Sequence, residues 1–104
     1  MNTPLDIDRG RLASFCARWR ILELDLFGSA LRDDFGPESD VDLLAVYAPD
    51  ARITLFDEAL MEEELETLFG RPVDLLSRRA VEESPNWIRR QAILESMEPL
   101  YVAP

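Results

Sequence analysis

The chain has 104 residues, a net charge of −10, and 47% apolar and 31% charged residues. This length suits a single domain, residues 1–104, and the apolar fraction excludes a disordered chain. No apolar run approaches the roughly 18–20 residues that cross a bilayer, and the negative charge disfavours contact with a nucleic-acid backbone. We therefore expect a cytoplasmic protein that binds neither membranes nor free nucleic acid directly.

The N-terminal part of the chain predicts a helix followed by a strand. Apolar residues recur at helical spacing up to Trp19, so we expect a first helix that begins near Asp8. Residues 21–27 alternate between apolar and acidic side chains, which predicts a strand with one apolar face. The residues expected on that face are Leu22, Leu24 and Leu26.

A turn, a loop and a second strand are expected next. Gly28-Ser29 ends the first strand, and Ser29 is placed to cap a short helical segment over residues 30–33. Residues 35–39 predict a tight loop because they contain a Gly-Pro pair. Residues 41–47 are nearly all apolar, so this second strand is expected in the middle of the sheet, before a turn over 48–52.

The second half of the chain predicts two long helices and two short strands. Residues 55–69 form the clearest amphipathic helix, and Gly70 is placed to end it. A strand is expected over 73–76, then an interrupted helix over 82–97, and a last strand over 100–102. The apolar stripe of the first helix consists of Leu55, Phe56, Ala59, Leu60, Met61, Leu65, Leu68 and Phe69. The core residues expected from the second are Trp87, Ile88, Ala92, Ile93 and Leu94.

This order of helices and strands predicts an α+β fold. Short strands alternating with helices are typical of a small mixed β-sheet that helices cover mainly on one face. The other face is then available for a ligand or a partner.

Two absences narrow the chemistry of the protein. The chain has no histidine, which excludes Ser-His-Asp and Cys-His catalysis and histidine-ligated zinc. Cys16 is the single cysteine, so no internal disulfide is possible, and its place in the first helix predicts a buried, inert thiol. Carboxylates and other oxygen groups are left to carry any catalysis.

Asp40 and Asp42 are the strongest candidates for a metal site. They lie two residues apart at the start of a strand, so both carboxylates project from the same face. Neighbouring carboxylates repel one another unless a cation lies between them, and Mg²⁺ prefers such oxygen ligands. Asp6 and Asp8 show the same spacing at a solvated helix start, so the pattern alone is not specific.

The context of this pair adds a phosphate site and a third carboxylate. Glycine lets a backbone approach phosphate closely, although Gly28-Ser29 alone also fits an ordinary turn with a capping serine. Asp74 lies within an apolar strand, where an unpaired charge is costly. If that strand neighbours the strand of Asp42, the carboxylates converge and suit nucleotidyl transfer, with Asp74 accepting a proton.

At these residues the sequence resembles the DNA polymerase beta-like nucleotidyltransferases. Their signature is Gly-Ser, a spacer and then Asp-x-Asp, and Gly28-Ser29, Arg32 and residues 39–44 match it. The resemblance is greatest to the minimal nucleotidyltransferases, the MntA-like antitoxins paired with HEPN-domain toxins, and it covers nearly the whole chain. It implies the nucleotidyltransferase fold for the α+β domain.

The resemblance also implies roles for single residues. It assigns the metal-binding pair to Asp40 and Asp42, and the third acidic residue to Asp74. Many family members have glycine after the arginine, whereas Asp33-Asp34 stand here, and two added negative charges would weaken nucleotide binding. The nucleotide-binding residues that the resemblance implies are Gly28, Ser29, Arg32 and Ser39.

For function, the resemblance implies an antitoxin that uses Mg²⁺ and ATP. In this family AMP is transferred from ATP to a tyrosine of the HEPN toxin, which silences its ribonuclease activity. A chain of this length leaves no residues for an acceptor-binding domain, so we expect a partner protein to bring the acceptor. One alternative is a non-catalytic antitoxin that neutralises the toxin by binding and occlusion. A transferase acting on a small molecule or an RNA end is the other, and the charge of −10 counts against it.

Overall fold

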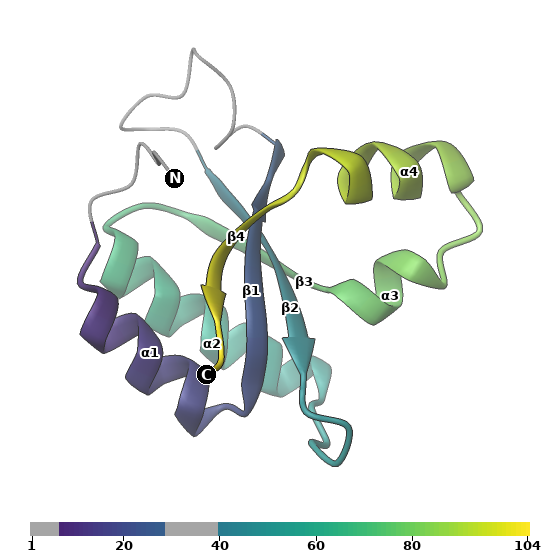
Figure 1. Cartoon of the computed structure of the whole chain (residues 1–104). Coiled ribbons are helices and arrows are strands. Elements are labelled where there is room, and N and C mark those ends of the chain that lie inside the picture. The colour runs from purple at the N-terminus through teal and green to yellow at the C-terminus, as the bar shows by residue number, and fades with distance from the viewer. Residues whose placement is uncertain (1–6, 29–39) are drawn as a thin grey trace.

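The computed structural model describes residues 7–28 and 40–104, which form one mixed four-stranded sheet with helices on both faces (Figure 1). The strand order is β3-β2-β1-β4, in which β1 pairs antiparallel with β2 and β4 while β2 pairs parallel with β3. The elements are α1 Arg9–Arg18, β1 Ile21–Phe27, β2 Val41–Tyr47, α2 Leu55–Phe69, β3 Val73–Ser77, α3 Arg78–Glu82, α4 Trp87–Ser96 and β4 Glu98–Val102. The predicted α+β class and the interior place of the second strand are confirmed.

The predicted helix boundaries follow from local capping. Asp8 accepts a hydrogen bond from the backbone of Arg11 and begins α1. Thr54 and Asp57 form a capping box at the start of α2, and Gly70 ends that helix in the left-handed conformation with a φ of 73°. The predicted segments 30–33 and 35–39 lie outside the described residues.

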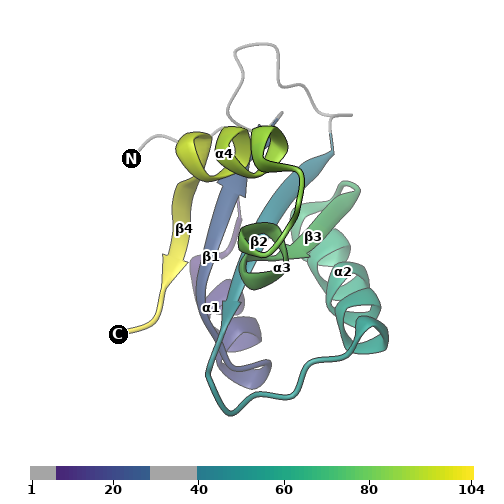
Figure 2. The ribbon, with the colours of Figure 1, turned by 90° about the vertical axis from the view of Figure 1, so that its right-hand side faces the viewer.

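Two apolar clusters lie on opposite faces of the sheet. The larger cluster packs α1 and α2 against one face, through side chains such as Phe15, Met61 and Leu43. The smaller one packs α3 and α4 against the other face, where Val81 and Ile93 meet β1 and β2. Figure 2 shows α4 crossing the sheet near the end of β1. The second face is therefore partly covered, which the element order did not predict.

Three details of the predicted packing were wrong. Leu22 is 41% exposed because the pairing of β1 with β2 shifts register between Ile21 and Glu23. The start of α4 projects beyond the sheet, so Trp87 is 60% exposed and Ile93 is the buried residue of that helix. The face of α2 that is turned to the core carries Met61 and Leu65 together with the half-buried Glu58 and Glu62, so the first part of the predicted stripe faces solvent. The exposed members are Leu55, Phe56, Ala59 and Leu60.

None of the described helices is both long and apolar enough to cross a membrane.

Candidate functional site

Three strand segments meet at one end of the sheet and bring two predicted site residues into register. Asp42 of β2 pairs with Asp74 of β3 in the parallel ladder, and with Phe27 of β1 in the antiparallel one. Directly opposed residues of a sheet project from the same face. Asp42 and Asp74 therefore lie side by side, on the face that also carries α3 and α4.

Gly28 lies against the carboxylate of Asp42. Its φ is 68°, and a Cβ atom placed on it would lie 2.5 Å from Oδ2 of Asp42. Side chains rarely adopt this backbone conformation, and no carbon fits at that distance. Glycine thus lets the carboxylate of Asp42 approach the backbone more closely than any other residue at position 28 would allow.

Helix α2 holds the strand of Asp74 through two carboxylates. The backbone N–H groups of Val73 and Leu75 donate to Glu66 and Glu62 at 3.2 and 2.8 Å. These N–H groups lie on the edge of β3 that has no neighbouring strand in the described sheet. The contacts satisfy the backbone donors of this edge strand and fix Asp74 between the two anchored residues.

The remaining predicted residues stand as follows. Asp40 directly precedes β2 and is exposed, Asp42 is half-buried, and Asp74 is exposed. Within residues 7–28 and 40–104, no three acidic or thiol side chains are close enough to hold a metal ion together. The structure therefore pairs two of the carboxylates and does not assemble all three. The predicted residues outside the described part of the chain are Ser29, Arg32 and Ser39.

The donor chemistry at this end of the sheet fits Mg²⁺. Paired carboxylates are hard oxygen ligands, and Mg²⁺ is usually bound by one or two of them together with water and substrate phosphates. Asp42 and Asp74 are adjacent, and Gly28 lets the carboxylate of Asp42 lie close to the backbone at the end of β1. Asp42 and Asp74 thus supply paired oxygen ligands of the kind that such an ion takes in company with a nucleotide.

A second acidic group lies further along β1 and was not predicted. Asp25 is fully buried and faces the covered side of the sheet, beside Glu23 and Arg78. Arg78 Nη1 lies 3.9 Å from Asp25 Oδ2 and 3.5 Å from Glu23 Oε2. Burial, and then the neighbouring Glu23, raise the pKa of Asp25 to about 7. The available signal was an acidic residue within an apolar strand, the argument that applied to Asp74.

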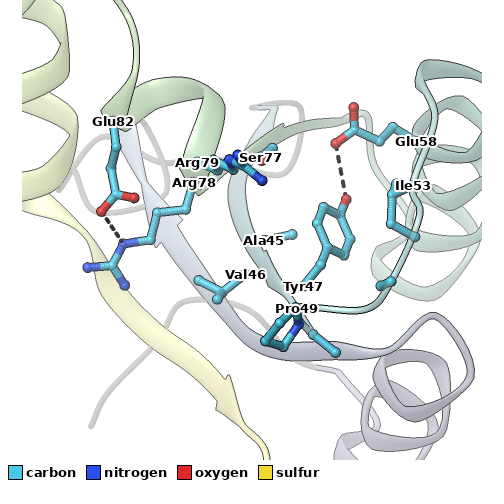
Figure 3. A pocket seen from close by; sticks show the side chains of 12 residues that line it. Ala45, Val46, Tyr47, Pro49, Ile53, Glu58, Ser77, Arg78, Arg79 and Glu82 are labelled. Atoms are coloured by element: carbon cyan, nitrogen blue, oxygen red, sulfur yellow. Dashed lines mark hydrogen bonds and ion pairs between the residues drawn. The ribbon is translucent and has the colours of Figure 1, made fainter.

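A pocket of about 530 Å³ lies at the opposite end of β2 (Figure 3). Tyr47 donates a hydrogen bond of 3.1 Å to Glu58 on one side, and Arg78 pairs with Glu82 at 3.6 Å on the other. Asp42 lies near the start of β2, whereas Tyr47 ends it, so this pocket is separate from the paired aspartates.

Comparisons with known proteins agree with the fold and with the class of site. A family described as nucleotidyltransferase domain matches residues 11–99. A solved structure described as a minimal nucleotidyltransferase is 34% identical, with a TM-score of 0.65 and coverage of 88% of each chain. No curated protein matches the sequence.

Two further solved structures share the fold at low identity. A toxin–antitoxin complex with AMP-PNP gives a TM-score of 0.70 at 16% identity, over 93% of this chain and 75% of that one. A tri-AMPylated HEPN toxin in complex with the MNT antitoxin, from Shewanella oneidensis, gives a TM-score of 0.62 at 16% identity. That match covers 90% of this chain and 69% of the other. At such identity the likeness concerns the fold alone.

Proposed function

This chain belongs to the nucleotidyltransferase domain family, and on this premise we propose that it is an antitoxin that transfers AMP from Mg-ATP to a tyrosine of a HEPN-domain toxin. The observation that carries the proposal is the register of Asp42 with Asp74, together with the close approach of the Asp42 carboxylate to the backbone of Gly28. Residues 1–104 act as one minimal nucleotidyltransferase domain in the cytoplasm.

The proposed reaction assigns a task to each residue of the site. Gly28 and Ser29 bind the triphosphate through their backbone, with Arg32 and Ser39 supporting it. Asp40, Asp42 and Asp74 hold Mg²⁺, which when bound orients the triphosphate and offsets the charge on the departing pyrophosphate.

The chemical step is a displacement at the α-phosphorus. The tyrosine oxygen forms a bond to that phosphorus, and the bond to the oxygen bridging to the β-phosphate breaks. Pyrophosphate leaves with the electron pair, and Asp74 accepts the phenolic proton. Asp74 is exposed and fixed by its anchored neighbours, so it can meet an acceptor that arrives from outside.

The structural neighbours support this choice of nucleotide and acceptor. One neighbour is a toxin–antitoxin complex with AMP-PNP, an ATP analogue, and another contains a HEPN toxin that carries three AMP groups. The acceptor tyrosine is inferred from the family resemblance.

Mass spectrometry of the partner tests the proposal. Purified protein is incubated with ATP, Mg²⁺ and a cognate HEPN-domain toxin. We expect the HEPN protein to gain the mass of one or more AMP groups, and Asp42→Asn to abolish the gain. Asp50→Asn is the matched control, because Asp50 is exposed and pairs only with Arg20 across the fold. No gain with wild-type protein contradicts the proposal.

A second candidate is neutralisation by binding and occlusion without catalysis. It is favoured by the exposed apolar residues of α2, such as Leu55, which is 85% exposed. The double variant Asp40→Asn/Asp42→Asn separates the two functions in cells that express the toxin. Full protection by this variant shows that occlusion suffices, whereas loss of protection shows that transfer is required.

A further inference from the structure

The first half of α2 presents apolar side chains to solvent on its outer face. Leu55 is 85% exposed, Phe56 is 74% exposed and Leu60 is 39% exposed. Phe56 and Leu60 are four residues apart, as are Leu55 and Ala59, so the four side chains share one side of the helix. We call Leu55, Phe56, Ala59 and Leu60 the docking patch.

The same helix has a separate, buried apolar face. Met61 and Leu65 are fully buried against the sheet and account for the contact of α2 with the core. The docking patch is therefore not needed to hold the helix in place. Single exposed apolar residues are common on monomers, but a cluster of them marks a surface that another molecule covers.

Charge selects the kind of molecule that covers the patch. Helix α2 contains six acidic residues and no basic residue. Asp57 and Glu58 lie between the patch residues in sequence, and the exposed Glu63 follows Leu60 by three positions, on the same side of the helix. A second copy of this chain would bring the same charge, and each copy has a net charge of −10. The complementary surface has apolar residues at its centre and basic residues around them.

A second exposed apolar pair, on α4, has different surroundings. Trp87 and Ile88 of α4 are 60% and 64% exposed, and the next two residues are Arg89 and Arg90. This pair does not suit a basic surface. The two exposed pairs therefore provide a comparison within one protein.

We propose that the docking patch binds the basic, RNA-binding surface of the HEPN toxin. This inference rests on the proposed function, which identifies the toxin as the partner. The docking patch and its acidic surroundings identify where the toxin binds. Proteins that bind RNA contact its phosphates with arginine and lysine, so a ribonuclease has the required charge. Binding there also shields that surface from RNA.

The dimensions of α2 allow docking and transfer to involve one partner molecule. A helix of 15 residues is about 22 Å long, which is less than the roughly 30 Å diameter of a small domain. The C-terminal end of α2 leads to β3, whose first residues flank Asp74. Because α2 and the side chain of Asp74 lie on opposite faces of the sheet, a partner on the docking patch reaches Asp74 around the β3 edge of the described sheet.

Two matched double variants test the site. Phe56→Ser/Leu60→Ser removes the centre of the docking patch, and Trp87→Ser/Ile88→Ser removes the exposed pair of α4. All four side chains are exposed, so both variants are expected to fold, which thermal melts will check. Titration calorimetry with the cognate HEPN protein should show Kd raised at least tenfold by the first variant and less than threefold by the second.

Kinetics and salt give two further readouts. In AMP transfer, the patch variant should raise KM for the HEPN protein while kcat at saturation is kept, because the catalytic residues are intact. The affinity of the wild-type protein should fall as salt concentration rises, and Glu63→Arg should weaken binding.

Several outcomes overturn the inference. An unchanged Kd for the patch variant, or an equal loss for both variants, shows that the toxin binds elsewhere. A wild-type dimer that becomes monomeric in Phe56→Ser/Leu60→Ser shows that a second copy covers the patch. If the wild-type protein does not bind the HEPN protein at all, both proposals fail, whereas binding without AMP transfer overturns only the catalytic one.

Discussion

Replacing Gly28 by alanine tests whether the approach of the backbone to Asp42 builds the site. The substitution adds a single methyl group at a φ of 68°, with the new Cβ 2.5 Å from Asp42 Oδ2. Because neither the backbone nor the carboxylate can keep its place, we expect a loss of both stability and AMP transfer.

The size of the effect follows from two contributions. A residue with a Cβ in the left-handed region costs about 1–2 kcal/mol, which lowers Tm by roughly 4–8 °C per kcal/mol in a domain of this size. The clash adds a displacement of the Asp42 carboxylate. A displacement of about 1 Å at a reacting group lowers the rate by roughly 10²-fold. Thermal melts measure the first contribution and the rate of AMP transfer to the HEPN protein measures the second.

Gly70→Ala is the matched control. Gly70 has nearly the same backbone conformation, with a φ of 73°, but a Cβ there meets nothing within 4 Å. It should lose a similar amount of stability and keep its transfer rate. The reasoning is refuted if Gly28→Ala transfers AMP at the wild-type rate, or if Gly70→Ala loses transfer to the same extent.

Three further predictions concern buried and anchoring groups. Burial raises the pKa of Asp25 to about 7, above the roughly 3.9 of an unfolded aspartate. The contribution of Asp25 to stability is therefore fully present below about pH 4 and is lost as pH rises through 7. In chemical denaturation, Asp25→Asn should show a weaker dependence of the free energy of unfolding on pH, and at about pH 8 it should be more stable than the wild-type protein. Glu62→Ala should lower the free energy of unfolding by about 1.5–3 kcal/mol and slow transfer, since Leu75 N–H loses its charged acceptor. The control Glu95→Ala, at an exposed glutamate that accepts a hydrogen bond from Gln91 on its own helix, should do neither, and an equal loss in both would refute the anchoring role. Burial raises the pKa of Cys16 to about 12, so a thiol reagent should modify it only on unfolding, and rapid labelling of native protein would contradict this.

Local patterns in the sequence predicted most of the secondary structure, but they missed α3 Arg78–Glu82, because a single interrupted helix was expected over 82–97. The predicted bounds of β1, β2 and α2 agree with the structure, because period-two and helical patterns and the glycine at position 70 act over a few residues. The family could also be recognised from Gly28-Ser29 and the Asp-x-Asp pair, since these residues are close in the chain.

Which face an apolar residue occupies depended on tertiary packing. The sequence shows that α2 is apolar on a broad stripe, but the way the helix packs on the sheet decides that Met61 is buried and Phe56 is exposed. In the same way, α3 and α4 cover part of the second face, so that Asp25 is buried although an alternating strand predicts a solvated acidic side chain.

At the candidate site, too, the sequence determined some features and the tertiary structure decided others. The sequence by itself determined which residue types are available, namely two aspartates after a Gly-Ser turn and a third aspartate in a later strand. Only the tertiary structure decided that β3 lies parallel to β2 with Asp74 beside Asp42, and that Gly28 lies against that carboxylate. Strand pairing joins residues that are 32 positions apart in the chain, and such contacts depend on the whole core, so local patterns do not encode them.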